Sequence, residues 1–173
     1  METTKNKLSV YESDFFNKLS NYLENKLYFY GSIQRDDYKP GHSDIDVDIF
    51  TDNPDSTIIK IQNFLNVTKQ DFKKFVNKPM KKQGIINGYK LKYKEPENNF
   101  KTELSIYDIK YKDDILYEHG RKTTLPFIVS MLLIIIKFLY YNIGIISKNI
   151  YLNMKNYIVE LVDDDYKGFV SFD

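Results

Sequence analysis

The spacing of apolar residues predicts helices and strands in alternation along the first half of the chain. Between residues 8 and 26 they recur every three to four positions, which is typical of an amphipathic helix. The apolar run LYFY at 27–30 predicts a short strand, and the strict alternation of DIDVDIF at 44–50 predicts a second one. The segment TIIKIQNFL at 57–65 returns to helical spacing.

The second half continues this mixture. We expect a helical piece around DFKKFV (71–76), followed by strands at 85–94 and 101–110 that the turn EPENN joins into an antiparallel hairpin. Helices at about 124–141 and 148–162, separated by a glycine-containing turn, complete the chain. This order favours the α+β class: a small mixed sheet with flanking helices and a short C-terminal helical pair.

Composition and charge exclude several classes of protein. The chain has 173 residues, a formal net charge of +1, two histidines and no cysteine. The lack of cysteine excludes a disulfide scaffold, a zinc finger and an iron–sulfur site. A net charge near zero argues against a protein that coats nucleic acid without specificity. With 42% hydrophobic and 28% charged residues, the composition is that of a globular protein long enough to bury a core.

One apolar run, at 125–146, is long enough to raise the question of a membrane helix. Lys137 lies at its middle, where a charge in lipid is costly, so we favour a buried core helix over a membrane-anchored form. The first residues, METTKNKLSVYESD, lack the apolar run that follows the charges of a secretory signal. We therefore expect a cytoplasmic protein without a membrane partner.

The most specific chemistry lies between residues 30 and 50. A predicted strand ends in Gly31-Ser32, and after eleven further residues Asp44 and Asp46 open the next strand. Glycine lets the backbone approach a phosphate closely, and a serine hydroxyl can hydrogen-bond it. Residues i and i+2 of a strand share one face, so the two carboxylates can bind one divalent cation. Oxygen ligands without histidine suit Mg²⁺ or Mn²⁺, and the pattern predicts metal-dependent phosphoryl transfer.

This pattern, GS-x11-DxD between two strands, resembles the nucleotidyltransferase superfamily of DNA polymerase beta. The segment YKPGHSDID (38–46) is closest to the form seen in poly(A) polymerases and terminal uridylyltransferases. The resemblance implies the polymerase-beta-type fold, with Gly31 and Ser32 on the β- and γ-phosphates of an NTP and with Asp44 and Asp46 on two divalent ions. The alternative is an exposed edge strand whose aspartates are merely solvated, although like charges on one face are best tolerated where a cation binds.

The family places a third carboxylate, which activates the acceptor hydroxyl, on a later strand beside the first two. Glu103 in KTELSIYDI falls where the family usually has an aspartate, and we favour it over the alternative, Asp108. The two have opposite parity, so both cannot face the site from one regular strand. The resemblance therefore makes Asp44, Asp46 and Glu103 the metal ligands and the catalytic set. Asp48 is an addition, for which we expect a lysine partner.

The resemblance extends more loosely into the apolar helices at 125–158. In terminal transferases a lysine of the first helix contacts the triphosphate, and Lys137 matches that position; the alternative is an ammonium that reaches out to solvent. Ser147 and Tyr151 are secondary candidates for contacts with the ribose or base. The second domain of the family is normally longer than the segment present here.

Lysines crowd the segment 69–94. They could follow a phosphate backbone or simply be solvated on helix and strand faces. Tyr89 and Tyr93 alternate with them and could stack on bases or face the core. We expect His42 on the surface and His119 in a turn.

Together these features predict a small nucleotidyltransferase, with a catalytic domain at 1–120 and a helical extension at 121–173. It would transfer a nucleoside monophosphate from an NTP, with ATP the first choice, to an acceptor hydroxyl and release pyrophosphate. An RNA 3′ end is the first-choice acceptor. Two alternatives stay open: a minimal nucleotidyltransferase that adds AMP to a protein side chain, and a catalytically silent subunit that binds nucleotide or RNA. A homodimer is expected if the short helical extension leaves apolar faces uncovered.

Overall fold

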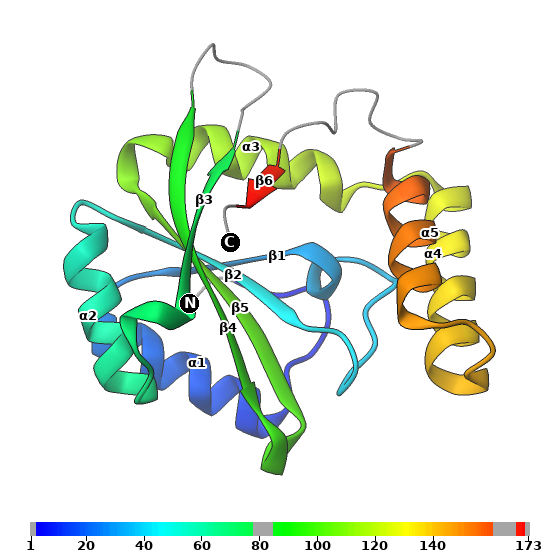
Figure 1. Ribbon diagram of the computed structural model, residues 1–173, viewed down its shortest axis with the longest axis horizontal. Helices are drawn as coiled ribbons and strands as arrows, with labels where there is room; N and C mark the ends of the chain where they lie inside the picture. Colours follow the sequence, from blue (N-terminus) through cyan, green and yellow to red (C-terminus); the bar gives the residue numbers. More distant parts are fainter. Residues whose placement is uncertain (1–2, 78–84, 161–168, 172–173) are drawn as a thin grey trace.

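The computed structural model describes residues 3–77, 85–160 and 169–171 (Figure 1). Within these ranges, one mixed sheet of six strands has the order β1-β2-β5-β4-β3-β6. Strands β2 and β5 pair in parallel, and the other neighbours pair antiparallel. The strands are β1 (Leu27–Tyr30), β2 (Ile45–Thr51), β3 (Phe72–Asn77), β4 (Ile86–Glu95), β5 (Phe100–Asp108) and β6 (Phe169–Ser171).

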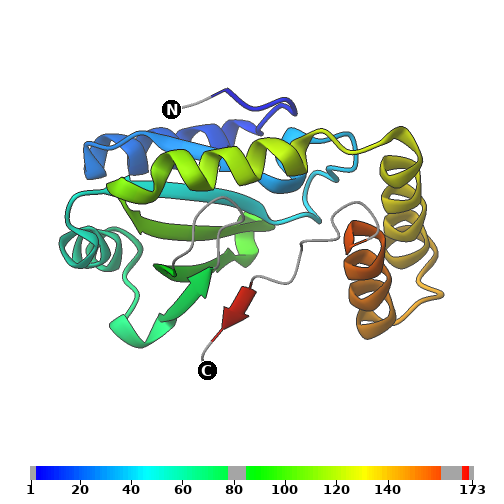
Figure 2. The same ribbon diagram turned by 90° about the horizontal axis from the view of Figure 1, so that it is seen from above.

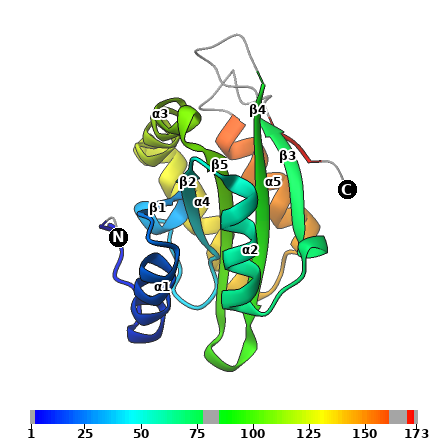
Figure 3. The same ribbon diagram turned by 90° about the vertical axis from the view of Figure 1, so that its left-hand side faces the viewer.

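Helices cover both faces of the sheet. Figure 1 shows α1 (Val10–Leu23) and α3 (Lys112–Thr123) on opposite sides of β1 and β2, and α2 (Pro54–Leu65) packs on the α1 side. The helices α4 (Phe127–Phe138) and α5 (Lys148–Glu160) lie side by side at one end of the molecule (Figure 2). Figure 3 looks from the opposite end, where α2 is nearest to the viewer. A π-helical turn, η5 (Leu139–Ile143), extends α4 toward the loop before α5.

The main core lies between the sheet and α1 with α2. Strand β2 contributes Ile45, Val47 and Ile49 to it, each at most 1% exposed, because alternate residues of a strand share a face. The neighbouring strand β5 adds Leu104 and Ile106 at 0% exposure. Burial of each such side chain stabilises the fold by about 1.5–3 kcal/mol.

A second, smaller core lies on the other face, under α3. Its buried members are all aromatic or aliphatic: Tyr28, Phe50, Phe75, Ile86, Tyr107 and Ile115. This core covers only one end of that face. The other end, toward the start of β2, carries polar residues and is where α4 and α5 approach the sheet (Figure 1).

The α+β class, the mixed sheet and the C-terminal helical pair are confirmed. The expected strands at 27–30 and 44–50 correspond to β1 and β2, and the expected hairpin corresponds to β4 and β5. The helix expected at 148–162 corresponds to α5, except that its last two residues lie outside the described ranges.

One expected element was wrong, one helix was missed, and one expected helix differs in its bounds. The helical piece expected around DFKKFV is instead strand β3, which pairs with β4 along its whole length. The helix α3 was missed, because its sequence KDDILYEHGRKT is polar and contains a glycine. The expected helix at 124–141 begins only after Pro126 and ends in the π-helical turn. No helix in the described ranges is both long enough and apolar enough to cross a membrane.

Candidate active site

The candidate site forms where β1 ends and β2 begins. Strand β1 turns at Gly31 into a short 3₁₀ helix, η1 (Gly31–Gln34), and the chain returns through a loop to β2. In the sheet, Asp46 of β2 lies opposite Tyr30 on one side and opposite Glu103 of β5 on the other. Asp44 immediately precedes β2 and is exposed, whereas Asp46 is half-buried. The fold therefore brings the three predicted carboxylates to one end of two parallel strands.

Gly31 allows the close approach of the turn to Asp46. Its φ of +73° lies in the left-handed region, and a Cβ atom at this position would overlap Asp46 Oδ2. The half-buried Ser32 follows, and its hydroxyl makes no hydrogen bond with a described residue. The backbone of the turn and this hydroxyl are thus available to a ligand next to Asp46.

The surroundings of Asp46 shift its pKa strongly upward. Burial, and then the negative charges of Glu103 and Asp44, raise its pKa from the ordinary value of 3.8 to about 7, although Lys155 and Lys90 oppose the shift. The Asp46 carboxylate keeps some exposed surface, but burial and its two acidic neighbours disfavour its ionised form. A bound cation would relieve this repulsion.

Glu103 directs both of its oxygens to lysines of β4. Oε1 lies 2.6 Å from Lys90 Nζ, and Oε2 lies 3.3 Å from Lys92 Nζ. Asp108, the alternative third carboxylate, lies at the other end of β5, opposite Thr51. Its carboxylate pairs with Lys110 at 3.0 Å, and the backbone and side chain of Lys110 lower its pKa. The strand register therefore favours Glu103 as the partner of Asp46.

The donor set at this site fits a hard divalent cation in kind. Asp44 and Asp46 offer carboxylate oxygens beside a turn that can hold phosphate, and burial together with the charges of Glu103 and Asp44 raises the pKa of Asp46. Among the described residues, however, no three acidic or histidine side chains already converge on one point. Glu103 can join as a third ligand by exchanging its lysine partners for the cation.

Asp48 continues the polar face one step further along β2 and is fully buried. Its Oδ2 lies 2.9 Å from His119 Nδ1 of α3, within ion-pair distance but without the alignment of a hydrogen bond. Burial raises the pKa of Asp48, while His119 opposes the shift. The His119 ring stacks on Tyr30 with centroids 4.0 Å apart. The expected lysine partner of Asp48 and the expected turn at His119 were both wrong, since a helical histidine takes that place.

Lys137 links the helical pair to the loop before β2. It is 5% exposed, and its Nζ lies 2.9 Å from Asp37 Oδ2 and 3.3 Å from the Ser43 hydroxyl. Arg35 Nε also pairs with Asp37, at 2.7 Å. Burial alone would raise the pKa of Asp37, but the hydrogen bonds and charges of Arg35 and Lys137 hold it below its ordinary value. The alternative of an ammonium in solvent is wrong: Lys137 fastens α4 to the loop that carries Ser43 and Asp44.

The helical pair also faces the site with aromatic rings. Tyr140 stacks on the buried Tyr151, with centroids 4.7 Å apart and planes 7° apart. The exposed His42 lies against Tyr141, with centroids 4.8 Å apart. Ser147 is exposed, and its hydroxyl accepts a hydrogen bond from Ile150 N at the start of α5.

Lys155 is a site residue that sequence reasoning missed. It follows Tyr151 by four residues, so both lie on the same face of α5, and its charge lowers the pKa of Asp46. The i, i+4 spacing from a buried tyrosine was the available signal. Lys90 and Lys92 were noted only as part of a basic segment, and strand parity alone did not reveal their pairing with Glu103.

Comparison with known proteins bears on the same region. The family model of the nucleotidyltransferase domain matches residues 13–122, which contain the β1 turn, β2 and β5. Neither the curated proteins nor the solved structures gave a match. The matched span is well over half of the chain and includes Gly31, Asp44, Asp46 and Glu103. The chain therefore belongs to the nucleotidyltransferase domain family of the polymerase-beta-like superfamily, whose general activity is transfer of a nucleoside monophosphate.

Proposed function

We propose that this nucleotidyltransferase is metal-dependent and transfers a nucleoside monophosphate from an NTP, ATP first, to the 3′ hydroxyl of an RNA, in the manner of terminal and poly(A) polymerases. The observation that carries the proposal is the strand register that sets Asp46 opposite Glu103, beside the turn at Gly31. Residues 1–120 form the catalytic domain in this proposal, and 121–173 form the helical extension.

The turn and the two aspartates bind the triphosphate. The backbone at Gly31 and the Ser32 hydroxyl hold the β- and γ-phosphates, because the turn passes close to Asp46 and both residues are only half-buried. Asp44 and Asp46 would hold Mg²⁺ or Mn²⁺. Divalent ions bound there would neutralise charge on the phosphoryl oxygens and favour the alkoxide form of the acceptor hydroxyl. The neighbouring charges of Glu103 and Asp44, which help to raise the pKa of Asp46, support this role because a bound cation would offset their repulsion.

Glu103 acts as the general base for the acceptor hydroxyl. The acceptor hydroxyl oxygen attacks the α-phosphorus, its proton passes to a Glu103 carboxylate oxygen, and pyrophosphate leaves with the bonding electrons. For this step Glu103 must release Lys90 and Lys92, which now hold its oxygens at 2.6 and 3.3 Å. The freed ammonium groups would then lie beside incoming phosphates. The lysine pair thus holds the Glu103 side chain in place until the substrates arrive.

Lys137 positions the loop that leads to Asp44. The prediction that it contacts the triphosphate stays a prediction, while its contacts with Asp37 and Ser43 support a positioning role. By holding this loop, Lys137 fixes the approach of the chain to Asp44. Lys155 is the lysine of the helical pair whose charge acts on Asp46, and we assign it the contact with the triphosphate.

A catalytically silent nucleotide-binding subunit is the second candidate. The two ion pairs on Glu103 favour it, because a glutamate held by lysines is a poorer base and metal ligand than a free aspartate. In that case the aspartates would bind nucleotide and cation without turnover.

One assay separates the candidates. The protein would be incubated with each labelled NTP, Mg²⁺ or Mn²⁺, and an oligo(A) RNA, beside an Asp44→Ala/Asp46→Ala control of matched folding. We expect extension of the RNA that is lost in the control. Label on protein rather than RNA would move the acceptor to a protein side chain. Nucleotide binding without incorporation of any NTP would contradict the proposal and favour the silent subunit.

A further inference from the structure

Four lysines form a row on the same face of the sheet as the candidate site. We define the lysine row as Lys90, Lys92, Lys94 and Lys101. The three on β4 alternate along the strand and therefore share a face. Cross-strand neighbours also share a face, and the register pairs Lys92 with Glu103 and Lys94 with Lys101.

The row has a defined start and a direction. Its inner end, Lys90 and Lys92, flanks Glu103, which lies opposite Asp46, and its outer end, Lys94 and Lys101, lies toward the tip of the β4–β5 hairpin. Alternate residues on a strand are about 6.8 Å apart, which is close to the spacing of successive phosphates in an extended single strand. A polyanion with its end at the site could therefore meet one ammonium group after another.

The outer half of the row carries unbalanced positive charge. Lys94 lies directly opposite Lys101, and like charges in such a pair are destabilising. Neither lysine forms an ion pair with a residue that the structure describes. Lys92, next to them, keeps 69% of its side chain exposed although it pairs with Glu103. An anion laid across this position would remove the repulsion.

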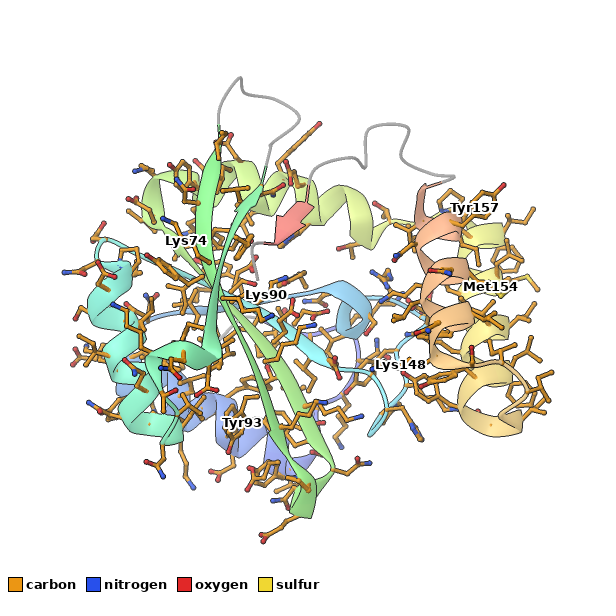
Figure 4. All side chains as sticks on the ribbon, in the orientation of Figure 1. Lys74, Lys90, Tyr93, Lys148, Met154 and Tyr157 are labelled. Carbon is orange, nitrogen blue, oxygen red and sulfur yellow. The ribbon has the colours of Figure 1, made fainter. Side chains whose placement is uncertain are left out.

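Aromatic residues of β4 do not take part. Tyr89 and Tyr93 have the opposite parity and pack against the core under α1 and α2. In Figure 4, Lys90 and Tyr93 lie on different sides of β4. The alternative that these tyrosines stack on bases beside the lysines is therefore wrong, and the face offers charge without base stacking.

We propose that the lysine row binds the phosphate backbone of a single-stranded nucleic-acid acceptor, with the acceptor's 3′ end at Glu103 and upstream phosphates toward the hairpin tip. This inference rests on the proposed function, since it names the path of the acceptor for that site. A nucleic acid fits better than an acidic protein, because the row repeats at a regular spacing along one strand.

The test is a binding titration that needs no turnover. The full chain in EDTA, without NTP, is titrated with fluorescently labelled oligo(A) of twelve nucleotides between 50 and 300 mM salt, and anisotropy is measured. The variant Lys94→Ala/Lys101→Ala leaves the groups around Asp46 unchanged. Its matched control is Lys18→Ala/Lys74→Ala, which removes the same charge from α1 and from the opposite face of β3.

We expect the Lys94→Ala/Lys101→Ala variant to bind about 20-fold more weakly at 0.1 M salt, because each lost phosphate contact lowers the salt slope by about 0.7. The control should stay within about twofold of the parent. Equal behaviour of the two variants would overturn the proposal, and so would a poly-glutamate peptide that binds the parent as tightly as the RNA. Because the titration contains no NTP and no divalent cation, its result tests the lysine row even if the protein shows no transfer activity.

Discussion

The two faces of strand β2 carry opposite kinds of chemistry. Ile45, Val47 and Ile49 face α1 and α2 and are at most 1% exposed, so they contribute to the apolar core. Asp46 and Asp48, between them, face α3 and the helical pair, and burial raises the pKa of both. The alternating residues of β2 thus place apolar side chains on one face and carboxylates on the other. The polar face lowers stability, because burial disfavours the ionised forms of both carboxylates.

Conversion of glycine to alanine at the turn should produce the largest functional effect. In Gly31→Ala, the new methyl group would displace Asp46, and we expect transfer to fall at least about 100-fold, as for a small misplacement of a reacting group. Gly41→Ala is the matched control, because Gly41 has a similar φ of +71° but contacts Asn99 rather than Asp46. Steady-state transfer rates would be compared after both variants are shown to fold. Equal losses in the two would indicate that backbone strain, rather than Asp46, is responsible.

Truncation on the apolar face should affect stability alone. We expect Ile49→Ala to lower the free energy of unfolding by about 2–5 kcal/mol, because it opens a cavity in a filled core. Transfer per folded molecule should stay within about threefold of the parent. Denaturant unfolding and rates at low temperature would measure the two quantities, with Ile59→Ala, at a 57% exposed position, as a control that changes neither. A selective loss of transfer in Ile49→Ala would show that the two faces are not separable.

The ion pair of Lys137 tests how the polar face is held to the helical pair. Lys137→Met leaves Asp37 with only Arg35, and we expect a loss of about 2–3 kcal/mol, below the usual cost of breaking a buried pair. The double variant Lys137→Met/Asp37→Asn should recover part of it. Thermal unfolding and the KM for NTP would be measured together. Unchanged stability with a KM raised 100-fold would instead indicate that Lys137 contacts the triphosphate.

The pH dependence of stability should reveal the strain on Asp46, with a slope of at most about 1.4 kcal/mol per pH unit. Its folded pKa of about 7 lies above the ordinary 3.8, so the folded state binds the proton more tightly. This contribution is fully present below pH 4 and is lost as the pH rises through 7. In EDTA, the parent should therefore lose stability between pH 4 and 7 relative to Asp46→Asn. Parallel curves for the two proteins would contradict the assignment.

The alternation of DIDVDIF and the GS-x11-DxD spacing were enough to predict β1, β2 and the position of the candidate carboxylates. The alternation is a local pattern that depends on strand geometry, whereas the choice of Glu103 as the third carboxylate came from the resemblance to the family. The parity argument stated only that Glu103 and Asp108 cannot both face one site, and the register makes Glu103 the neighbour of Asp46. The predicted roles of these residues stay predictions.

Long-range contacts were beyond the sequence. Nothing near His119 indicates that α3 would bring it to Asp48, 71 positions earlier in the chain. Likewise, Lys137 lies 100 residues from Asp37, and the apolar sequence of its helix does not indicate that the lysine pairs with a buried carboxylate. In both cases a buried charge needs a partner, because an unpaired buried charge is costly. Tertiary packing decides which residue becomes that partner, and the linear sequence does not show it.

The central claim is that Asp46 and Glu103, side by side on parallel strands, form the reactive centre. The most direct test is the single-turnover rate of transfer from ATP to RNA by Glu103→Gln, measured beside Asp108→Asn. We expect Glu103→Gln to lower the rate at least about 100-fold, the range of general acid–base catalysis, and Asp108→Asn to stay within about threefold of the parent. A Glu103→Gln variant that keeps the parental rate, or a loss confined to Asp108→Asn, would contradict the account.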